Sequence, residues 1–225
     1  LFASFDDEPV AAASIAQVHF AETTEGAKVA VKILRPGIEA RFRRDLDLFR
    51  WAARVMERAR PDLKRLKPRE VVETIAQSVE LEMDLRFEAA AAAEMADNFA
   101  GDDTFVIPAV DWARTGSRVL TTERIDGFPI NDVEGITAAG IDPKTVVENA
   151  ARAFFNQVFR DGFFHADLHP GNLFVMDGGA IGAVDFGIMG RVDKKTRRNL
   201  GEMLLGFLTR DYRRAAEVHF EAGWV

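Results

Sequence analysis

Cysteine is absent from this chain of 225 residues. Its absence excludes disulfide bonds, a thiol nucleophile, and zinc or iron–sulfur centres that depend on cysteine ligands. Long apolar runs are missing as well, since no stretch reaches the roughly 18 residues that a membrane-spanning helix requires. Positive charge is not in excess: 29 Lys and Arg stand against 36 Asp and Glu, a net charge of -7. That balance argues against general nucleic-acid binding.

The composition is that of a folded protein. Hydrophobic residues make up 48% of the chain and charged residues 29%, which excludes a disordered chain and a collagen-like fibre. The length suits one large domain or two small lobes around a shared cleft. The first residues lack the basic start of a secretory signal. Because the chain begins with Leu1 and a helical pattern runs to its last residue without a stop signal, we expect it to be a piece of a longer protein.

Apolar periodicity predicts an α+β protein in which strands come first and helices later. Strands are expected over 18–21, 28–33, 105–108, 118–122, 173–176 and 180–184, and single helices over 38–60, 68–95 and 142–162. The last of these helices would bury Val146, Val147, Ala150, Ala153, Phe154 and Val158. Gly178 and Gly179 mark the turn of a hairpin that leads into Asp185.

Basic residues gather in one segment of this acidic chain. Positions 32–70 hold thirteen Lys and Arg and six Asp and Glu, a local net charge of +7, which leaves -14 for the rest. One interpretation is solvated helix faces. The other is a surface that binds anionic lipid or an acidic partner, where each surface Lys or Arg contributes about 1 kcal/mol.

The strongest chemical signal is the run His165-Ala166-Asp167-Leu168-His169-Pro170-Gly171-Asn172, with Asp185-Phe186-Gly187 thirteen residues after Asn172. Phosphoryl transfer needs a carboxylate that orients the attacking hydroxyl and oxygen ligands that hold Mg²⁺ against the phosphates. We predict Asp167 as the catalytic base, and Asn172 and Asp185 as metal ligands. Each residue alone could serve only as a turn or cap residue. Their combination at this spacing favours phosphoryl-transfer chemistry.

His165 and His169 lie four residues apart, which raises the question of a zinc site. Pro170 and Gly171 break any helix there, and the Glu of the zinc-protease motif is missing. We therefore predict that His165 supports the catalytic loop through hydrogen bonds and that His169 is also structural.

Lys32 closes the apolar strand Val29-Ala30-Val31-Lys32. Taken alone, a lysine there could extend to solvent. Upstream of the Asp–Asn–Asp set, it matches the lysine that binds the α- and β-phosphates. Such a lysine needs a carboxylate partner, and the candidates are Glu80, Glu82, Asp84 and Glu88. Asp84 and Glu88 would share a helix face; Glu88 is favoured, although spacing leaves the choice open.

A loop without glycine stands where kinases carry a glycine-rich phosphate loop. Its residues are Ala11, Ala12, Ala13, Ser14, Ile15 and Ala16. Alanine still exposes backbone amides but restricts φ, so this loop should be stiffer than its glycine counterpart. The alternative is a plain helical turn. The position ahead of the strand pair favours a nucleotide-binding loop.

Together these motifs resemble the UbiB family of atypical protein-kinase-like proteins. The resemblance rests on residues 11–19, 29–32, 82–84, 165–172 and 184–187, and it extends over nearly the whole chain. It implies an α+β, bilobal protein-kinase-like fold, with an antiparallel sheet and inserted helices in the N-lobe and a mainly helical C-lobe. We expect the N-lobe over 1–126, with the alanine-rich loop and the family-specific helices. A truncated C-lobe, with the catalytic and Asp-Phe-Gly loops, would cover 127–225.

The resemblance also implies further site residues. Glu82 and Asp84 would form the family's Glu-x-Asp motif, and Lys32 would pair with Glu88. Glu123 and Ile125 would belong to a hinge beside the adenine, with ATP and Mg²⁺ as cofactors. Lys32 and the later polar loops should then meet around one triphosphate.

Two departures from the family pattern bear on these expectations. The N-terminal Lys-x-Gly-Gln segment and the C-terminal part, which often carries membrane helices, are not in the sequence. Ala166 replaces the arginine that reads a phosphorylated activation loop in ordinary kinases, so we expect no regulation of that kind.

The resemblance implies an atypical kinase or ATPase that supports ubiquinone (coenzyme Q) biosynthesis at a membrane. The alternatives are a small-molecule phosphotransferase of the aminoglycoside or choline kinase type, and a nucleotide-dependent lipid-binding scaffold that transfers no phosphoryl group. Expected partners are a lipid or quinone precursor, an anionic membrane surface and other ubiquinone-biosynthesis proteins, but not nucleic acid. The expected location is the cytoplasmic face of the bacterial inner membrane, or the matrix side in mitochondria.

Overall fold

The computed structural model describes residues 1–224, apart from the side chains at positions 61, 63 and 64. These residues group into two compact units. The first unit consists of Leu1–Ala93 and Ala109–Arg124, and the second of Glu94–Pro108 together with the chain from Ile125 onward. The sequence divided the chain once, between 126 and 127, and that division into lobes stays a prediction.

The first unit is built on an antiparallel sheet. Its strands among the described residues are β1 (Phe2–Phe5), β2 (Ala11–Ala12), β3 (Ala16–Thr23), β4 (Lys28–Leu34) and β6 (Val119–Glu123). They follow the order β1–β3–β4–β6, with β2 paired to β3. Val29 and Val31 of β4 are buried in one cluster, against which Ile33 also packs, as alternation along one strand face requires. Leu34 has the opposite phase and is buried in a separate cluster. The strands predicted over 18–21, 28–33 and 118–122 are confirmed.

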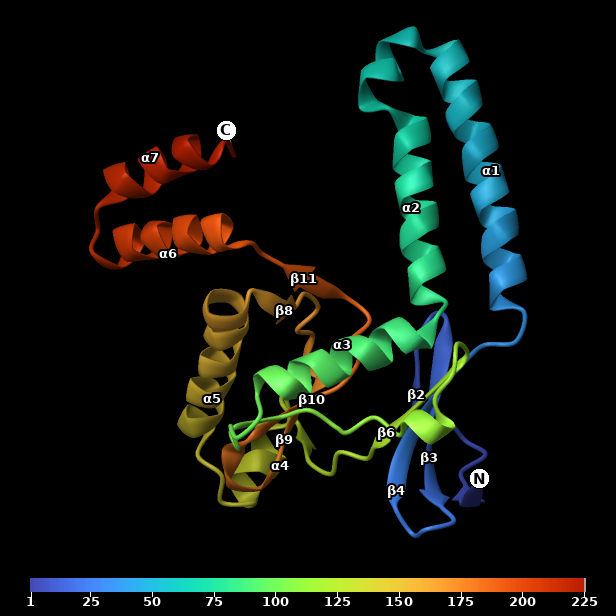
Figure 1. Cartoon of the computed structure of the whole chain (residues 1–225), viewed down its shortest axis with the longest axis vertical. Coiled ribbons are helices and arrows are strands. Elements are labelled where there is room, and N and C mark those ends of the chain that lie inside the picture. The colour runs from blue at the N-terminus through green and yellow to red at the C-terminus, as the bar shows by residue number, and fades with distance from the viewer. Residues whose placement is uncertain (225) are drawn as a thin grey trace. The chain divides into compact units, whose positions relative to one another are not determined.

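Helices are inserted between β4 and β6. They are α1 (Ile38–Ala59), η1 (Pro61–Leu66), α2 (Pro68–Glu82), α3 (Leu85–Asn98) and the short η2 (Trp112–Arg114), and β5 (Phe105–Val106) follows α3. The helices α1 and α2 lie side by side as a hairpin (Figure 1). Leu46 and Ala53 of α1, and Val72 and Ala76 of α2, are buried at helical spacing. Arg50 and Glu73 link the two helices through an ion pair of 2.9 Å.

The single helix predicted over 68–95 is wrong, because the chain breaks between α2 and α3. Asp84 lies in the break, where its carboxylate accepts a hydrogen bond from the Arg86 backbone N–H at 3.1 Å. The Leu85 N–H donates to the Ser117 carbonyl at 2.9 Å, outside any helix. Aspartate favours such capping positions over helix interiors. The expected shared helix face of Asp84 and Glu88 is therefore wrong as well.

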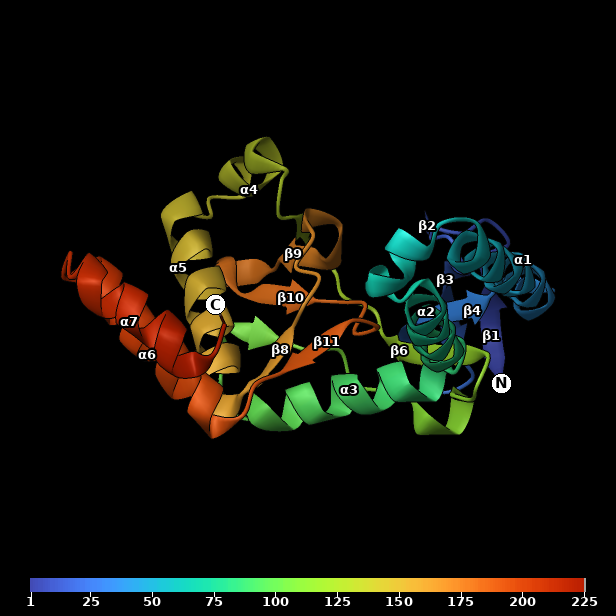
Figure 2. The ribbon, with the colours of Figure 1, turned by 90° about the horizontal axis from the view of Figure 1, so that it is seen from above.

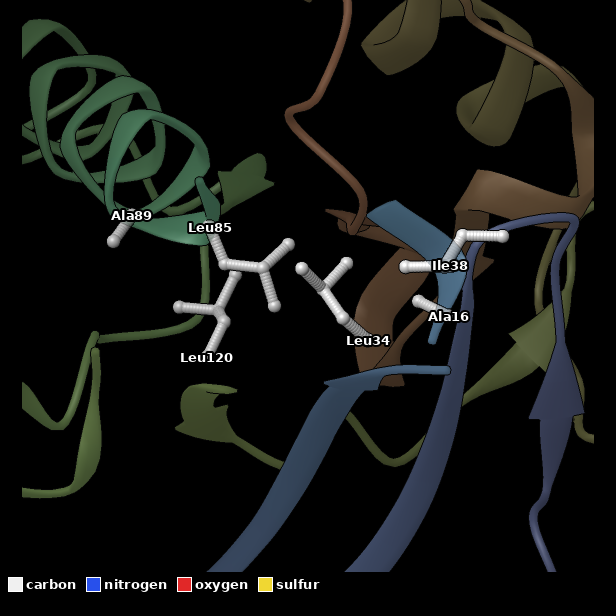
Figure 3. Packing of buried hydrophobic residues seen from close by; sticks show 6 residues of the cluster. All are labelled: Ala16, Leu34, Ile38, Leu85, Ala89 and Leu120. Carbon is white, nitrogen blue, oxygen red and sulfur yellow. The ribbon is translucent and has the colours of Figure 1, made fainter. Parts of the chain in front are cut away.

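A buried cluster joins α3 to the sheet of the first unit. Figure 3 shows Leu85 pointing toward Leu34 and Leu120. The complete cluster is Ala16, Leu34, Ile38, Leu85, Ala89 and Leu120. Burial of one leucine side chain contributes about 1.5–3 kcal/mol. The cluster therefore fixes the start of α3 against β4.

The second unit contains two small sheets within its described residues. One has the order β5–β10–β9–β7, in which β10 pairs parallel to β5 and antiparallel to β9, and the other joins β8 to β11. The strands not yet located are β7 (Phe128–Pro129), β8 (Phe163–His165), β9 (Leu173–Val175), β10 (Ile181–Ala183) and β11 (Met189–Arg191). The hairpin predicted around Gly178 and Gly179 is confirmed as β9 and β10, while β5 is shorter than the predicted strand 105–108.

Helices make up most of the second unit. They are α4 (Val133–Ala138), α5 (Pro143–Phe155), α6 (Lys194–Leu208) and α7 (Tyr212–Ala222), with the short turns η4 (Pro170–Asn172) and η5 (Asp177–Gly179). Figure 2 shows α6 and α7 side by side. No helix within residues 1–224 is both long enough and apolar enough to cross a membrane.

Helix α5 begins as the sequence predicts, and three of the six residues expected inside, Val146, Ala153 and Val158, are buried. The Asp142 carboxylate accepts from the Lys144 N–H at 2.9 Å, and Pro143 opens the helix. The helix continues as a π-helical segment, η3 (Asn156–Asp161), up to Gly162. Val147 and Phe154, which we expected inside, are 67% and 40% exposed. Two polar residues, Asn149 and Gln157, are buried on the stripe formed by Val146 and Ala153 instead.

Gly162 ends η3 in a conformation that excludes side chains. Its φ is 67°, and a Cβ there would lie 2.6 Å from the Val192 carbonyl oxygen. We predict that Gly162→Ala lowers the free energy of unfolding by at least about 2 kcal/mol, since a left-handed backbone costs about 1–2 kcal/mol before any clash. Urea denaturation provides the measurement. Gly140→Ala is the control, because Gly140 has a φ of 77° but no atom within 4 Å of the added Cβ. Equal losses in the two variants would contradict the steric argument.

Candidate active site

Lys32 and Glu88 form an ion pair inside the first unit. The Lys32 ammonium donates to both carboxylate oxygens of Glu88, at 2.8 and 2.9 Å. Only 14% of the Lys32 side chain and 8% of the Glu88 side chain are exposed. Glu88 lies in the first turn of α3, where the helix dipole stabilises a negative charge. The structure thus selects Glu88, which the sequence favoured, among the open choices.

The other candidate carboxylates lie around the break between α2 and α3. Glu82 is the exposed last residue of α2. Asp84 receives a hydrogen bond of 2.8 Å from the Arg86 guanidinium, and this bond lowers the pKa of Asp84. Both residues of the Glu-x-Asp pair therefore precede α3, with Asp84 four residues and Glu82 six residues ahead of Glu88.

The alanine-rich segment forms a strand and a turn rather than a helical turn. Ala11 and Ala12 pair with Val18 and Gln17, and the Ala13 N–H donates to the Ala16 carbonyl at 2.9 Å. Arg35 donates through its Nε to the Ala13 carbonyl at 3.1 Å. Residues 11–14 are exposed. Ala16 is buried in the core cluster, so only its backbone is suited to a ligand.

The two predicted hinge residues fall in different units. Glu123, at the end of β6, pairs with Ala109: its N–H donates to the Ala109 carbonyl at 2.9 Å, and its carboxylate accepts from the Ala109 N–H at 3.2 Å. Ile125 belongs to the second unit and packs over Gly182, where an added Cβ would lie 2.9 Å from the Ile125 Cδ1. A side chain at position 182 would therefore displace Ile125.

Hydrogen bonds join the predicted catalytic and metal-binding segments within the second unit. The Asn172 side-chain amide donates to the Asp167 carbonyl at 3.2 Å. The Val184 N–H donates to the Asn172 carbonyl at 2.9 Å, directly before Asp185. The first bond uses the nitrogen end of the Asn172 amide, and the oxygen end is the one that Mg²⁺ binds. The structure therefore brings together Asp167, Asn172 and Val184, which links strand β10 to Asp185.

The buried side chain of His165 contacts both the segment of Asp167 and the segment before Asp185. Only 1% of it is exposed. Its Nδ1 accepts from the Asp167 N–H at 3.2 Å, and its Nε2 lies 3.4 Å from the Val184 carbonyl oxygen. Since Nδ1 accepts, the proton belongs on Nε2, which donates to Val184. The imidazole also packs against the Phe186 ring, with 5.5 Å between the two ring centroids. These contacts fit the supporting role that the sequence predicted.

Asp185 has a backbone that few non-glycine residues adopt. Its φ is 62°, and its carboxylate accepts from the Gly187 N–H at 3.3 Å. Aspartate and asparagine tolerate this left-handed region best among side chains. Such conformations cluster at functional sites. Phe186, next in the chain, is buried and holds the turn in place.

The donor set suits a magnesium ion that also binds phosphate. Within residues 1–224, no three His, Asp or Glu side chains gather as a metal cluster. Asp185 and Asn172 would supply one carboxylate and one amide oxygen. Mg²⁺ accepts such a pair because it keeps waters and takes phosphate oxygens as its other ligands.

Comparison with known proteins places this geometry in a family. The model of the ABC1 atypical kinase-like domain matches residues 1–219. The chain belongs to the family of ABC1 atypical kinase-like domains. Its sequence is 45% identical over 230 residues to the "Probable protein kinase UbiB" of Marinobacter nauticus, covering 100% of this chain and 42% of that protein. Identity to the protein of the same name from Aeromonas salmonicida is 43%, with the same coverage. The chain thus spans about two fifths of the length of these relatives.

A solved structure supports the fold. The complex of Rv3197 with erythromycin from Mycobacterium tuberculosis matches with a TM-score of 0.73 and 31% identity, over 99% of this chain and 55% of that one. The predicted fold class, α+β and kinase-like with an antiparallel N-terminal sheet followed by helical elements, is confirmed. The kinase-like nature of the domain is confirmed with it.

Sequence reasoning missed one buried residue of this kinase-like site. Gln157, 1% exposed, accepts a hydrogen bond from the His165 N–H through its Oε1 at 2.9 Å. The available signal was its position four residues after Ala153, on the stripe that α5 buries. A polar residue on a buried stripe requires a partner. The sequence pattern did not show which backbone group that partner would be.

Proposed function

We propose that the full-length protein is an ATP- and Mg²⁺-binding atypical kinase or ATPase that supports ubiquinone biosynthesis at a membrane. The observation that carries the proposal is the hydrogen-bonded assembly of Asp167, Asn172 and the segment before Asp185. The Lys32–Glu88 ion pair adds to it, because this pair supplies a directed positive charge.

Each residue has a role in phosphoryl transfer. Lys32, held by Glu88, presents its ammonium to the α- and β-phosphates. Asp167 orients the acceptor hydroxyl, or a water molecule, and takes its proton at the carboxylate. Asn172 and Asp185 would hold Mg²⁺, and the ion would neutralise charge on the phosphate oxygens. Residues 11–16 cover the nucleotide, and the backbone of Glu123 and Ile125 binds the adenine.

Family membership extends the proposal to ubiquinone biosynthesis. The relatives described above carry the UbiB name and come from bacteria. We therefore place the full-length protein at the cytoplasmic face of the inner membrane, rather than on the matrix side of a mitochondrion. Its proposed partners are a lipid or quinone precursor, an anionic membrane surface and other proteins of ubiquinone biosynthesis. The basic residues of segment 32–70 are the part of the chain whose charge suits that surface.

The test is ATP hydrolysis by the full-length protein with and without Mg²⁺, anionic liposomes and phenolic analogues of quinone precursors. We expect Mg²⁺-dependent hydrolysis that the liposomes and phenols increase. Neutral liposomes and a non-phenolic aromatic compound serve as controls. Hydrolysis that no phenol or anionic lipid alters would contradict the ubiquinone role, and absence of Mg²⁺-dependent nucleotide binding would contradict the whole proposal.

A small-molecule phosphotransferase is a second candidate, favoured by one observation. The similar Mycobacterium tuberculosis protein was solved in complex with erythromycin, a hydroxylated antibiotic. Labelled ATP offered with hydroxylated antibiotics and choline distinguishes this candidate, since transfer of label to any of them would support it. Nucleotide binding without hydrolysis or transfer would instead favour a lipid-binding scaffold.

A further inference from the structure

The helix before the catalytic loop ends in an uncommon turn. The residues of η3 follow α5 without a break and adopt a π-helical conformation up to Gly162. Single π-turns are rare and are frequent at functional sites. Outside contacts hold this one in place: Arg197 of α6 donates to the carbonyls of Phe159 and Arg160. The turn is therefore a fixed element rather than a frayed helix end.

Gln157 lies in the first turn of η3 and faces strand β8. Among the described residues, β8 pairs with one strand, β11, in which Met189 stands opposite His165. The Ala166 N–H donates toward that strand, to the Ile188 carbonyl at 2.9 Å. Successive N–H groups of a strand point to opposite sides, so the His165 N–H points away from β11. A buried N–H needs an acceptor, and Gln157 Oε1 is that acceptor.

The imidazole of His165 links the Gln157–His165 hydrogen bond to the two loops that carry Asp167 and Asp185. The His165 Nδ1 accepts from the Asp167 N–H, and its Nε2 donates to the carbonyl of Val184, the residue before Asp185. A shift of the His165 backbone would move both bonds at once. Because the ring is buried against Phe186, it has little room to compensate.

We propose that Gln157 is a positioning residue for the phosphoryl-transfer site: through His165 it fixes the backbones that carry Asp167 and Asp185. The inference deepens the proposed function and rests on it for the roles of the two aspartates. Gln157 is buried and would not itself touch the nucleotide. Its effect arises because loss of this acceptor would leave the buried His165 N–H unsatisfied, which favours a shift of the His165 backbone toward another acceptor.

The test compares three variants of the full-length protein. Gln157→Met keeps the length of the side chain and removes the strong acceptor. Gln157→Glu keeps an acceptor oxygen at the same reach, whether or not its carboxyl is ionised. Asn149→Leu is the matched control, since Asn149 is a buried amide of the same helix whose one described bond, 2.9 Å to the Gly179 carbonyl, leads away from His165. The measurements are kcat and KM for ATP and the amide hydrogen exchange of segments 163–167 and 184–187.

We expect Gln157→Met to lower kcat by about tenfold or more, the usual effect of losing a residue that orients functional groups, with KM changed by less than about threefold. Exchange should accelerate in both segments. Gln157→Glu should recover most of kcat, and Asn149→Leu should alter neither segment even if its melting temperature falls. Equal losses of kcat in Gln157→Met and Asn149→Leu, or unchanged exchange at 184–187, would overturn the inference.

Hydrogen exchange separates this inference from the proposed function. If the wild-type protein hydrolyses no ATP, the proposed function fails, and exchange alone then decides the positioning role. Faster exchange at 184–187 in Gln157→Met supports it, and unchanged exchange refutes it.

Discussion

Replacing Asp185 by Asn should weaken Mg²⁺-dependent nucleotide binding by about 100-fold. Loss of a residue that only supports a metal ligand lowers metal affinity by up to about 100-fold, and Asp185 is the proposed ligand itself. Asparagine tolerates the left-handed φ of 62° at this position. Its amide oxygen can still accept from the Gly187 N–H, as the carboxylate does. The variant therefore removes the negative charge while keeping the turn. Calorimetric titration of the full-length protein with ATP, in Mg²⁺ and in EDTA, measures the effect.

The Mg²⁺ dependence makes this test specific. Affinity in EDTA should change by less than about threefold, because the charge matters mainly through the cation. Asp177→Asn is the control: Asp177 is an exposed carboxylate in the turn between β9 and β10, and its loss should leave both affinities unchanged. An Asp185→Asn protein that binds ATP equally well with and without Mg²⁺, at the wild-type affinity, would refute the metal assignment.

Lys32→Ala should weaken ATP binding by about 30-fold, which corresponds to about 2 kcal/mol for the loss of a charged hydrogen-bond donor. At an ATP concentration of about 100 times the wild-type Kd, ATP stabilises the wild-type protein by about 2.7 kcal/mol. The variant should gain only about 0.9 kcal/mol under the same conditions. Thermal unfolding with and without ATP provides the measurement. Equal thermal shifts in the two proteins would count against a phosphate-binding role for Lys32.

Two further variants separate binding from stability. Lys28→Ala removes an exposed lysine from the start of the same strand and should leave the ATP shift unchanged. Lys32→Ala also leaves the buried Glu88 carboxylate without its ion pair, which costs about 3 kcal/mol in comparable pairs. The double variant Lys32→Met/Glu88→Gln removes both charges, so it should recover most of the unliganded stability. It should not recover ATP binding.

Local patterns predicted the regular elements well. Strands β3, β4 and β6, helix α1 and the β9–β10 hairpin follow from alternation, helical periodicity and paired glycines. These signals act over a few neighbouring residues, so the sequence expresses them directly. The motif residues Asp167 and Asn172 could be found for the same reason, because they lie five positions apart in one loop.

Predictions failed where a residue bonds to a partner that is distant in the sequence. The break at Asp84 depends on a bond from Leu85 to Ser117, which is remote in the chain. The buried face of α5 carries Asn149 and Gln157 because Gly179 and His165 supply their partners. Periodicity counts apolar residues and cannot register such pairings.

The identities and spacing of residues 11–19, 29–32, 165–172 and 184–187 already indicated the family, which the comparison confirms over residues 1–219. Folding alone chose Glu88 over Glu80, Glu82 and Asp84 as the partner of Lys32, and Gln157 as the support of His165. Both choices depend on which polar groups burial brings within hydrogen-bond distance. A buried charge or N–H must find a partner among the groups that packing places beside it, and packing is a property of the whole unit.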